Sequence, residues 1–247
     1  MTVENQRDVD GLLAAGRVVS DVLSRMLDAL EPGITTAELD RLGERLLAER
    51  GARSAPRITY DFPGATCISI NEQAAHGVPG PRRIEPGDVV NVDVSAELVG
   101  YFADTGGTRV VPPVSGLKSR LCHAGARALQ EAMKEVRAGN LVNRLGRAVQ
   151  RVARTHRFKV IRNLAGHGVG RSLHEAPEEL VSYYRPHDPR ALREGMVIAV
   201  EPFLSTRATR VSESGDGWTL VAPPGNLSAQ YEHTLIVTCG RPIVVTA

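Results

Sequence analysis

The chain has 247 residues, of which 42% are hydrophobic, so it is long and apolar enough to bury a sizeable core, and disorder is not expected. Thirty basic against 28 acidic residues leave a formal net charge of +2, and the basic residues are scattered along the sequence. This balance predicts that neither nucleic acid nor a membrane surface is the main partner.

The three cysteines, Cys67, Cys122 and Cys239, are odd in number and form no CxxC pair, so neither a disulfide framework nor a cysteine zinc site is indicated. The N-terminal segment carries acids where a secretory signal has a basic start. No stretch reaches the roughly 18 apolar residues of a membrane-spanning helix. We therefore expect a soluble protein of the reducing cytoplasm.

Two amphipathic helices are predicted at the start of the chain. Apolar residues recur at helical spacing over residues 8–30 and stop at the Glu-Pro-Gly of residues 31–33. A second helix opens at Thr35, where Glu38 completes a candidate capping box, and runs to Gly51.

The pattern then changes to period two with β-branched residues over 65–111, which predicts a sheet region. Two more helices are predicted over 117–137 and 140–157, and strands return after them. The order of elements is thus helix, helix, strands, repeated once. This order predicts one domain over residues 1–247, built from two similar α+β halves at about 8–115 and 116–247.

A short repeat supports the two halves. EPGDVVNVDVS (residues 85–95) and REGMVIAVEPF (residues 193–203) each place an acid six residues after a glycine, with a short apolar strand between. The acids are Asp93 and Glu201. We expect each half to contribute carboxylates to a shared centre.

Four acids lie within apolar strands. A predicted turn at residues 98–100 would bring Asp93 and Asp104 roughly opposite each other on one face of a hairpin, and Glu201 and Glu232 repeat the arrangement later in the chain. Buried carboxylates that close repel each other and resist ionisation unless a cation lies between them. The strands therefore predict a cation centre.

His167, in AGHGVG, is the candidate nitrogen ligand, because its flanking glycines allow a close approach. Oxygen ligands suit Mg, Mn, Ca or Fe(II), and an imidazole shifts the preference toward Mn, Fe, Co, Ni or Zn. Five donors are too many for one small open site, so we infer two metal ions. Such a pair generates hydroxide near neutral pH and polarises a carbonyl, which suits hydrolysis of an amide.

Two further histidines, His76 and His174, could donate to a substrate carbonyl or oxyanion, although a single histidine in a Gly/Pro loop is equally often a turn residue. His233 follows Glu232 directly, so its side chain should point to the other face of the strand. The nucleophile elbow GxSxG, the phosphate-binding loop GxxxxGK[ST] and the zinc motif HExxH are absent.

The ordered segments HGVPG, NVDVS, FADTGGT, GHGVGRSLHEAP, EPF and SAQYEHTLIV together resemble the type I methionine aminopeptidases of the pita-bread M24 metallopeptidases, over nearly the whole chain. The resemblance implies an α+β fold with two pseudo-symmetric halves and a curved antiparallel sheet covered by helices. It also implies a cytoplasmic monomer that removes the initiator methionine from nascent proteins, at the ribosome, when the next residue is small.

The resemblance further implies two divalent ions, Mn, Co, Fe or Zn, bridged by two of the ligands. Glu201 would also handle the proton of the attacking water, His174 would bind the scissile carbonyl, and His76 would contact the substrate near the scissile amide. The implied ligands are Asp93, Asp104, His167, Glu201 and Glu232, with Asp104 and Glu232 bridging.

By the same resemblance, the methionine side chain would lie among Phe62, Cys67, His76, Leu173 and Trp218. Leu173 stands where family members often have an aromatic residue, Ala75 where they have cysteine and Phe102 where histidine is common. These departures leave open a related exopeptidase with another N-terminal preference, such as Xaa-Pro. A pita-bread protein that only binds peptides is a further alternative, although all five ligands are present.

Overall fold

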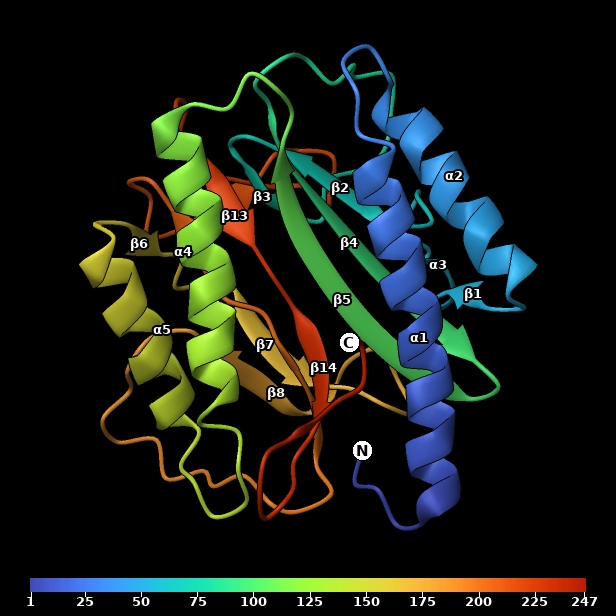
Figure 1. Cartoon of the computed structure of the whole chain (residues 1–247), viewed down its shortest axis with the longest axis vertical. Coiled ribbons are helices and arrows are strands. Elements are labelled where there is room, and N and C mark those ends of the chain that lie inside the picture. Colours follow the sequence, from blue (N-terminus) through green and yellow to red (C-terminus); the bar gives the residue numbers. More distant parts are fainter.

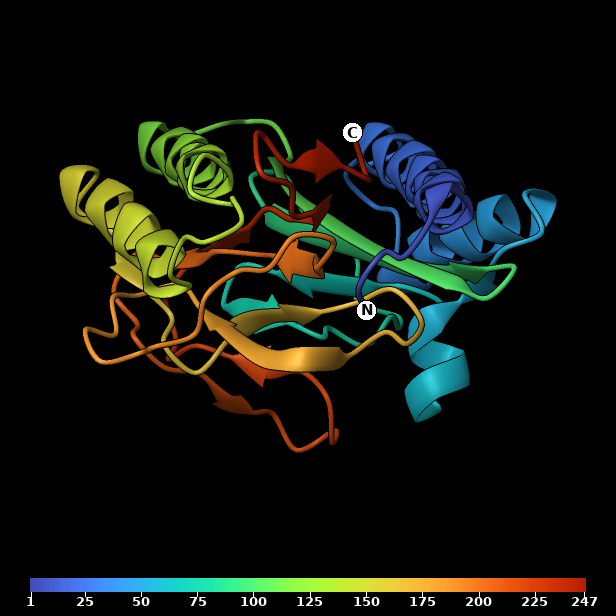
Figure 2. The ribbon, with the colours of Figure 1, turned by 90° about the horizontal axis from the view of Figure 1, so that it is seen from below.

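The computed structural model describes residues 1–247, with five helices and fifteen strands. The helices are α1 (Gln6–Asp28), α2 (Thr36–Glu49), α3 (Ala55–Tyr60), α4 (Gly116–Met133) and α5 (Asn143–Thr155). Figures 1 and 2 show the four long helices in one layer along one face of the strands. The predicted order of two helices and strands, repeated once, is observed, and only the short α3 was not predicted. None of the helices has the length and hydropathy needed to cross a membrane.

The two N-terminal helices follow the sequence pattern closely. α1 buries one stripe of side chains, including Leu12, Val19 and Met26, against the sheet. At the start of α2 the Thr35 hydroxyl accepts the Glu38 amide at 3.1 Å, and the Glu38 carboxylate accepts the Thr35 amide at 2.8 Å. This reciprocal pair is the predicted capping box, and it satisfies amides that a helix start leaves unpaired.

The first sheet is centred on a long hairpin. Strand β4 (Val89–Leu98) pairs antiparallel with β5 (Tyr101–Val110), and also with β1 (Arg53–Ser54) and β2 (Cys67–Ile70). The hairpin turn has only two residues, Val99 and Gly100, both with positive φ, at 50° and 81°. Such a turn matches the twist of the strands and fixes their register.

The second half builds a five-stranded sheet in the order β15-β14-β9-β7-β8. Two three-stranded sheets complete the fold, in the orders β13-β10-β6 and β11-β12-β3. The bounds of these strands are β3 (Gln73–Ala75), β6 (Lys159–Val160), β7 (Ala165–Gly168), β8 (Glu175–Val181), β9 (Val197–Val200), β10 (Phe203–Ser205), β11 (Ser212–Glu213), β12 (Leu220–Val221), β13 (Ser228–Gln230), β14 (His233–Ile236) and β15 (Ile243–Val244).

The two halves meet where β5 runs beside β14. The Asp104 amide donates to the Thr234 hydroxyl at 2.9 Å, and that hydroxyl donates to the Asp104 carbonyl at 2.8 Å. The Glu232 amide donates to the Gly106 carbonyl, also at 2.9 Å. Two large apolar clusters lie in the fold, one under α1 and α2 and the other under α4 and α5, and the first also takes in Val169, Val197 and Ile236 from the second half. The seam therefore places acids of both halves side by side.

Candidate metal centre

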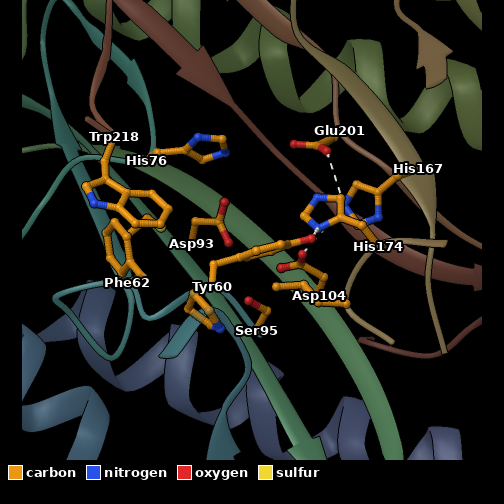
Figure 3. Close-up of a pocket in the computed structure, with 13 residues that line it drawn as sticks. Tyr60, Phe62, His76, Asp93, Ser95, Asp104, His167, His174, Glu201 and Trp218 are labelled. Carbon is orange, nitrogen blue, oxygen red and sulfur yellow. Dashed lines mark hydrogen bonds and ion pairs between the residues drawn. The ribbon is translucent and has the colours of Figure 1, made fainter. Parts of the chain in front are cut away.

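A pocket opens between the two halves, and thirteen side chains line it. Figure 3 shows Asp104, His167, His174 and Glu201 together on one side of the pocket and Phe62 and Trp218 on the other, with Asp93 between them. The lining residues are Pro56, Tyr60, Phe62, Cys67, His76, Asp93, Ser95, Asp104, His167, Leu173, His174, Glu201 and Trp218.

The hairpin register places two acids on one face. Asp93 pairs with Gly106 and Asp104 pairs with Ser95, so the two carboxylates are diagonal neighbours rather than directly opposite. Gly106 matters here because a Cβ at that position would overlap the side-chain amide of Gln230. Gly106, the cross-strand partner of Asp93, therefore leaves room for the Gln230 side chain to pack against the hairpin.

The second half supplies three more donors. Glu201 directly follows β9, Glu232 directly precedes β14, and His167 lies in β7 between β9 and β8. Asp104, His167 and Glu232 each offer a ligand atom within 4.8 Å of the others. The His167 Nε2 also lies 3.6 Å from the nearer Glu201 oxygen. The structure thus gathers the predicted donors in one place, with Glu232 buried behind the pocket wall.

The carboxylates are electrostatically unfavourable without a cation. Burial raises the pKa of Asp104 to about 6. Burial, followed by the charge of Asp104, raises the pKa of Asp93, Glu201 and Glu232 well above the usual range of a carboxylic acid. One oxygen of Asp104 and one of Glu232 have no hydrogen-bond partner. Buried oxygens with unused lone pairs fit divalent cations, because coordination supplies the missing partner and removes the repulsion.

His167 is prepared as a nitrogen ligand. Its Nδ1 lies 2.9 Å from the Gly168 carbonyl, which can only accept, so Nδ1 carries the proton and Nε2 keeps a free lone pair. Nε2 faces Asp104 at 3.8 Å and Glu201 at 3.6 Å. Burial, and then the neighbouring His174, lower the pKa of His167 to about 3. A neutral imidazole with an oriented lone pair is the form that binds metals.

A layer of amides behind the acids was not predicted. The Gln230 amide donates to Glu232 at 2.9 Å, and Asn91 donates to the Gln230 oxygen at 2.8 Å. Gln230 stands two residues before Glu232, so the period of two in a strand was an available signal that both face the same side. His233 lies on the opposite face, with Nδ1 2.9 Å from the Thr246 hydroxyl, as its position predicts.

His174 contacts a residue that the sequence did not point to. The Tyr60 hydroxyl lies 2.7 Å from His174 Nδ1, and the His174 ring is 3.9 Å from the His167 ring between centroids. Although the His174 ring keeps an exposed edge, lost hydration on its enclosed side and the nearby His76 lower its pKa to about 4. Tyr60 ends the short helix α3, and no local pattern linked that helix to the pocket.

The other side of the pocket is largely apolar. Phe62 and Trp218 meet edge to face with ring centroids 5.2 Å apart, and Cys67, His76 and Leu173 complete the predicted group. Of the three departures from the family pattern, only Leu173 lines this pocket. Ala75 is buried beside it, and Phe102 packs against the first apolar cluster.

Comparison with known proteins identifies the family. The model of metallopeptidase family M24 matches residues 10–239. The chain belongs to metallopeptidase family M24. It is 44% identical to methionine aminopeptidase 2 of Bacillus subtilis (strain 168), across 100% of this chain and 99% of that protein.

Solved M24 structures confirm the predicted pita-bread fold. The crystal structure of methionine aminopeptidase from Rickettsia prowazekii matches with a TM-score of 0.95 and 32% identity, covering 100% of both chains. A prolidase from Pyrococcus furiosus matches with a TM-score of 0.78 and 21% identity, and this chain covers 65% of its length. The second likeness shows the fold alone. The M24 match also makes the chain a metallopeptidase, in agreement with the acidic and histidine cluster.

Proposed function

We propose that this protein is a metal-dependent aminopeptidase that removes the N-terminal methionine from nascent proteins. The observation that carries the proposal is the convergence of buried donors beside an apolar pocket, in a chain similar over its full length to methionine aminopeptidases. An acidic and imidazole centre suits amide hydrolysis, and the adjoining pocket suits an unbranched apolar side chain.

The donor set fits two divalent ions, held by Asp93, Asp104, His167, Glu201 and Glu232. Asp104 and Glu232 would be the ligands shared by both ions, as the family resemblance implies, and each has one buried oxygen that accepts no hydrogen bond and could bind a cation. When bound, the ions lower the pKa of a water molecule and polarise the scissile carbonyl. Mixed carboxylate and imidazole ligands accept Mn, Co, Fe or Zn.

Several side chains of the pocket have separate roles in the proposed hydrolysis. Glu201 accepts the proton of the attacking water, and as a pocket-lining acid it can pass that proton to the leaving amine. In the proposed tautomer of His174 the Tyr60 hydroxyl donates to Nδ1, so that the His174 proton lies on Nε2 and can be donated to the oxygen of the tetrahedral intermediate. His76, which also lines the pocket, is placed to bind the scissile amide.

The methionine side chain is proposed to lie among Phe62, Cys67, His76, Leu173 and Trp218, which face the same pocket. The partner is the N-terminal segment of a nascent protein, met in the cytoplasm at the ribosome by a monomeric enzyme. We also propose a single domain over residues 1–247 with halves at about 8–115 and 116–247, a division that the repeated order of two helices followed by strands supports.

A peptide panel tests the proposal. Metal-stripped protein is refilled in turn with Mn, Co, Fe(II) and Zn and is given Met-Ala-Ser, Leu-Ala-Ser, Ala-Ala-Ser and Ala-Pro-Ser. We expect selective release of methionine with at least one metal and no hydrolysis without metal. Preferential cleavage of Leu-Ala-Ser, Ala-Ala-Ser or Ala-Pro-Ser would contradict the proposed substrate. No cleavage with any metal would contradict the enzymatic function.

A further inference from the structure

The outer side of α5 carries a concentration of positive charge that the metal centre does not use. Between Glu135 and Glu175 the sequence contains no acidic residue but nine arginines and lysines. The net charge of +2, from which no nucleic-acid partner is predicted, is a sum over the whole chain and does not reveal this local excess of positive charge. Seven of the nine form a surface that we name the basic face: Arg144, Arg147, Arg151, Arg154, Arg157, Lys159 and Arg162.

Most of this charge is not neutralised within the protein. All seven side chains are exposed. Arg144 pairs with Glu135 at 2.8 Å and Arg151 with Glu131 at 3.6 Å, whereas the other five form no ion pair. None of the seven lines the peptide pocket. In Figure 1 α5 lies at the outer edge of the helix layer, which leaves one side of the helix facing solvent.

The spacing of the cations follows from the helix. Arg144, Arg147, Arg151 and Arg154 recur every three or four residues, so their side chains emerge on one face of α5. The helical stripe from Arg144 to Arg154 is about 15 Å long at a rise of about 1.5 Å per residue, and Arg157 follows just beyond the end of α5. One surface hollow is lined by Arg144, Arg147 and Arg151, and another by Arg154, Lys159 and Arg162.

Two of the guanidinium groups lie over tyrosine rings. Arg147 lies over the Tyr184 ring at 4.1 Å and Arg162 over the Tyr183 ring at 4.8 Å. Stacking fixes the plane of a guanidinium group while leaving its edge free to donate two parallel hydrogen bonds. Planar, preoriented donors of this kind match the oxygens of a phosphate group.

We infer that the basic face binds the phosphate backbone of a structured RNA. A double-stranded nucleic acid carries one charge per about 1.7 Å of axis, both strands counted, so a stripe of about 15 Å runs beside a length of duplex that carries on the order of ten phosphates, of which the nearer ones face the stripe. An anionic membrane fits less well, because the exposed residues of α5 are arginines and one threonine, with no apolar side chain to insert. The apolar side of α5, with Leu145, Val149 and Val152, is buried in the second apolar cluster. This inference goes beyond the proposed peptidase activity.

The test measures binding of a fluorescein-labelled RNA hairpin by anisotropy, with KCl varied between about 50 and 200 mM. The test variant combines Arg147→Gln, Arg154→Gln and Arg157→Gln. The matched control combines Arg7→Gln, Arg17→Gln and Arg41→Gln, which are exposed, unpaired and outside the basic face. Hydrolysis of Met-Ala-Ser by the metal-loaded proteins checks that both variants are folded.

We expect the test variant to lose at least about tenfold in affinity and its salt slope to become shallower by about two to three, at 0.7–0.9 per lost phosphate contact. The control should bind as the wild type does, and both variants should keep wild-type hydrolysis. Equal losses in the two variants would overturn the inference, because they would report net charge alone. Weak binding of RNA combined with tight binding of phosphatidylserine vesicles or polyglutamate would overturn it in favour of a different partner.

Discussion

At the scale of single residues, the candidate metal centre buries carboxylates and an imidazole. Burying each of these groups alone is unfavourable, and a bound cation would make their burial together favourable. Asp104 and Glu232 each keep an oxygen without a hydrogen bond, and His167 keeps a free lone pair beside them. An unsatisfied buried acceptor costs about 1–3 kcal/mol. The sequence drew attention to these acids because acids are rare inside apolar strands, but it did not predict the amide of Gln230 that donates to Glu232 or the amide of Asn91 behind it.

Asp104→Asn should abolish hydrolysis. A neutral amide supplies one oxygen and a hydrogen-bond donor that faces the cations, so we expect kcat/KM to fall by roughly a thousandfold or more and metal binding to weaken. The fold should remain, because the substitution removes a buried charge. Calorimetric metal titration and circular dichroism check both points, with the exposed Asp10→Asn as the control. Normal turnover by Asp104→Asn would refute the ligand assignment.

Tyr60→Phe should lower kcat by up to about tenfold with little change in KM, because one hydrogen bond that orients His174 is worth about 0.5–1.5 kcal/mol. Nitrogen chemical shifts of the His174 ring, measured with the Zn-loaded protein, report which nitrogen carries the proton. Tyr184→Phe, outside the pocket, serves as the control. An unchanged kcat together with unchanged ring shifts would show that Tyr60 does not position His174.

Leu173→Phe should change the preference for methionine over leucine and norleucine at the N-terminus. A change of side-chain shape in an apolar pocket is worth about 1–3 kcal/mol of discrimination. Ratios of kcat/KM over the three peptides measure it. Ala75→Cys is the matched control, because Ala75 departs from the family pattern without lining the pocket. Identical ratios in wild type and Leu173→Phe would remove Leu173 from the specificity pocket.

At the scale of elements, the sequence predicted the features that depend on residues close together in the chain. The capping box at Thr35 and Glu38 is readable because both partners lie within one turn of helix. Helix ends were less accurate: α4 ends at Met133 and α5 begins at Asn143, several residues inside the predicted limits. The intervening turn includes Gly139 with φ of 86° and a bridge from Leu141 to Ala191, a long-range contact that no local pattern reveals.

The capping box gives a stability prediction. Thr35→Ala should lower the free energy of unfolding by about 1 kcal/mol, because the Glu38 amide loses the hydroxyl that accepts from it, and the Glu38 carboxylate loses the hydroxyl hydrogen bond that helps to orient it. Urea denaturation followed by circular dichroism measures the change. Thr35→Ser retains the hydroxyl and should lose much less. If serine and alanine destabilise the protein equally, the cap contributes no net stability.

At the scale of the whole molecule, the candidate metal centre depends on the contact between β5 and β14, where the two halves meet. It also depends on neutralisation of the charge of its buried carboxylates. The net charge of the sequence predicted neither the buried cluster of acids nor the basic face of α5, because a total does not report how charges are distributed. Register across the seam, such as Asp104 beside Thr234, arises from contacts 130 residues apart. Such pairings depend on the folded topology and are beyond local patterns.

Metal removal should destabilise the protein in a pH-dependent way. Without metal, the folded state raises the pKa of Asp104 to about 6 and raises those of Asp93, Glu201 and Glu232 as well. The unfolded chain has ordinary values near 4, so the folded state binds more protons, and stability is lost as pH rises from about 4 through 6 and above.

Thermal melting with EDTA and with Mn, at pH values from about 5 to 8, measures this effect. We expect the difference in Tm between metal-loaded and metal-free protein to widen as pH rises, since metal binds the ionised carboxylates and stabilises the folded state. A constant difference across this range would show that these acids do not titrate together with metal loss. Asp104→Asn should show a smaller widening than the wild type.

The seam also determines when the enzyme can first act during its own synthesis. Asp93 and Asp104 are made in the first half of the chain, whereas Glu232 is made only after β13. A ribosome-bound chain that has emerged only as far as β10 lacks the ligand Glu232 and also lacks β14, the strand whose Thr234 holds Asp104 in place. Peptidase activity should therefore appear abruptly, after both halves have emerged and docked. A partly synthesised copy cannot trim the N-termini of neighbouring chains.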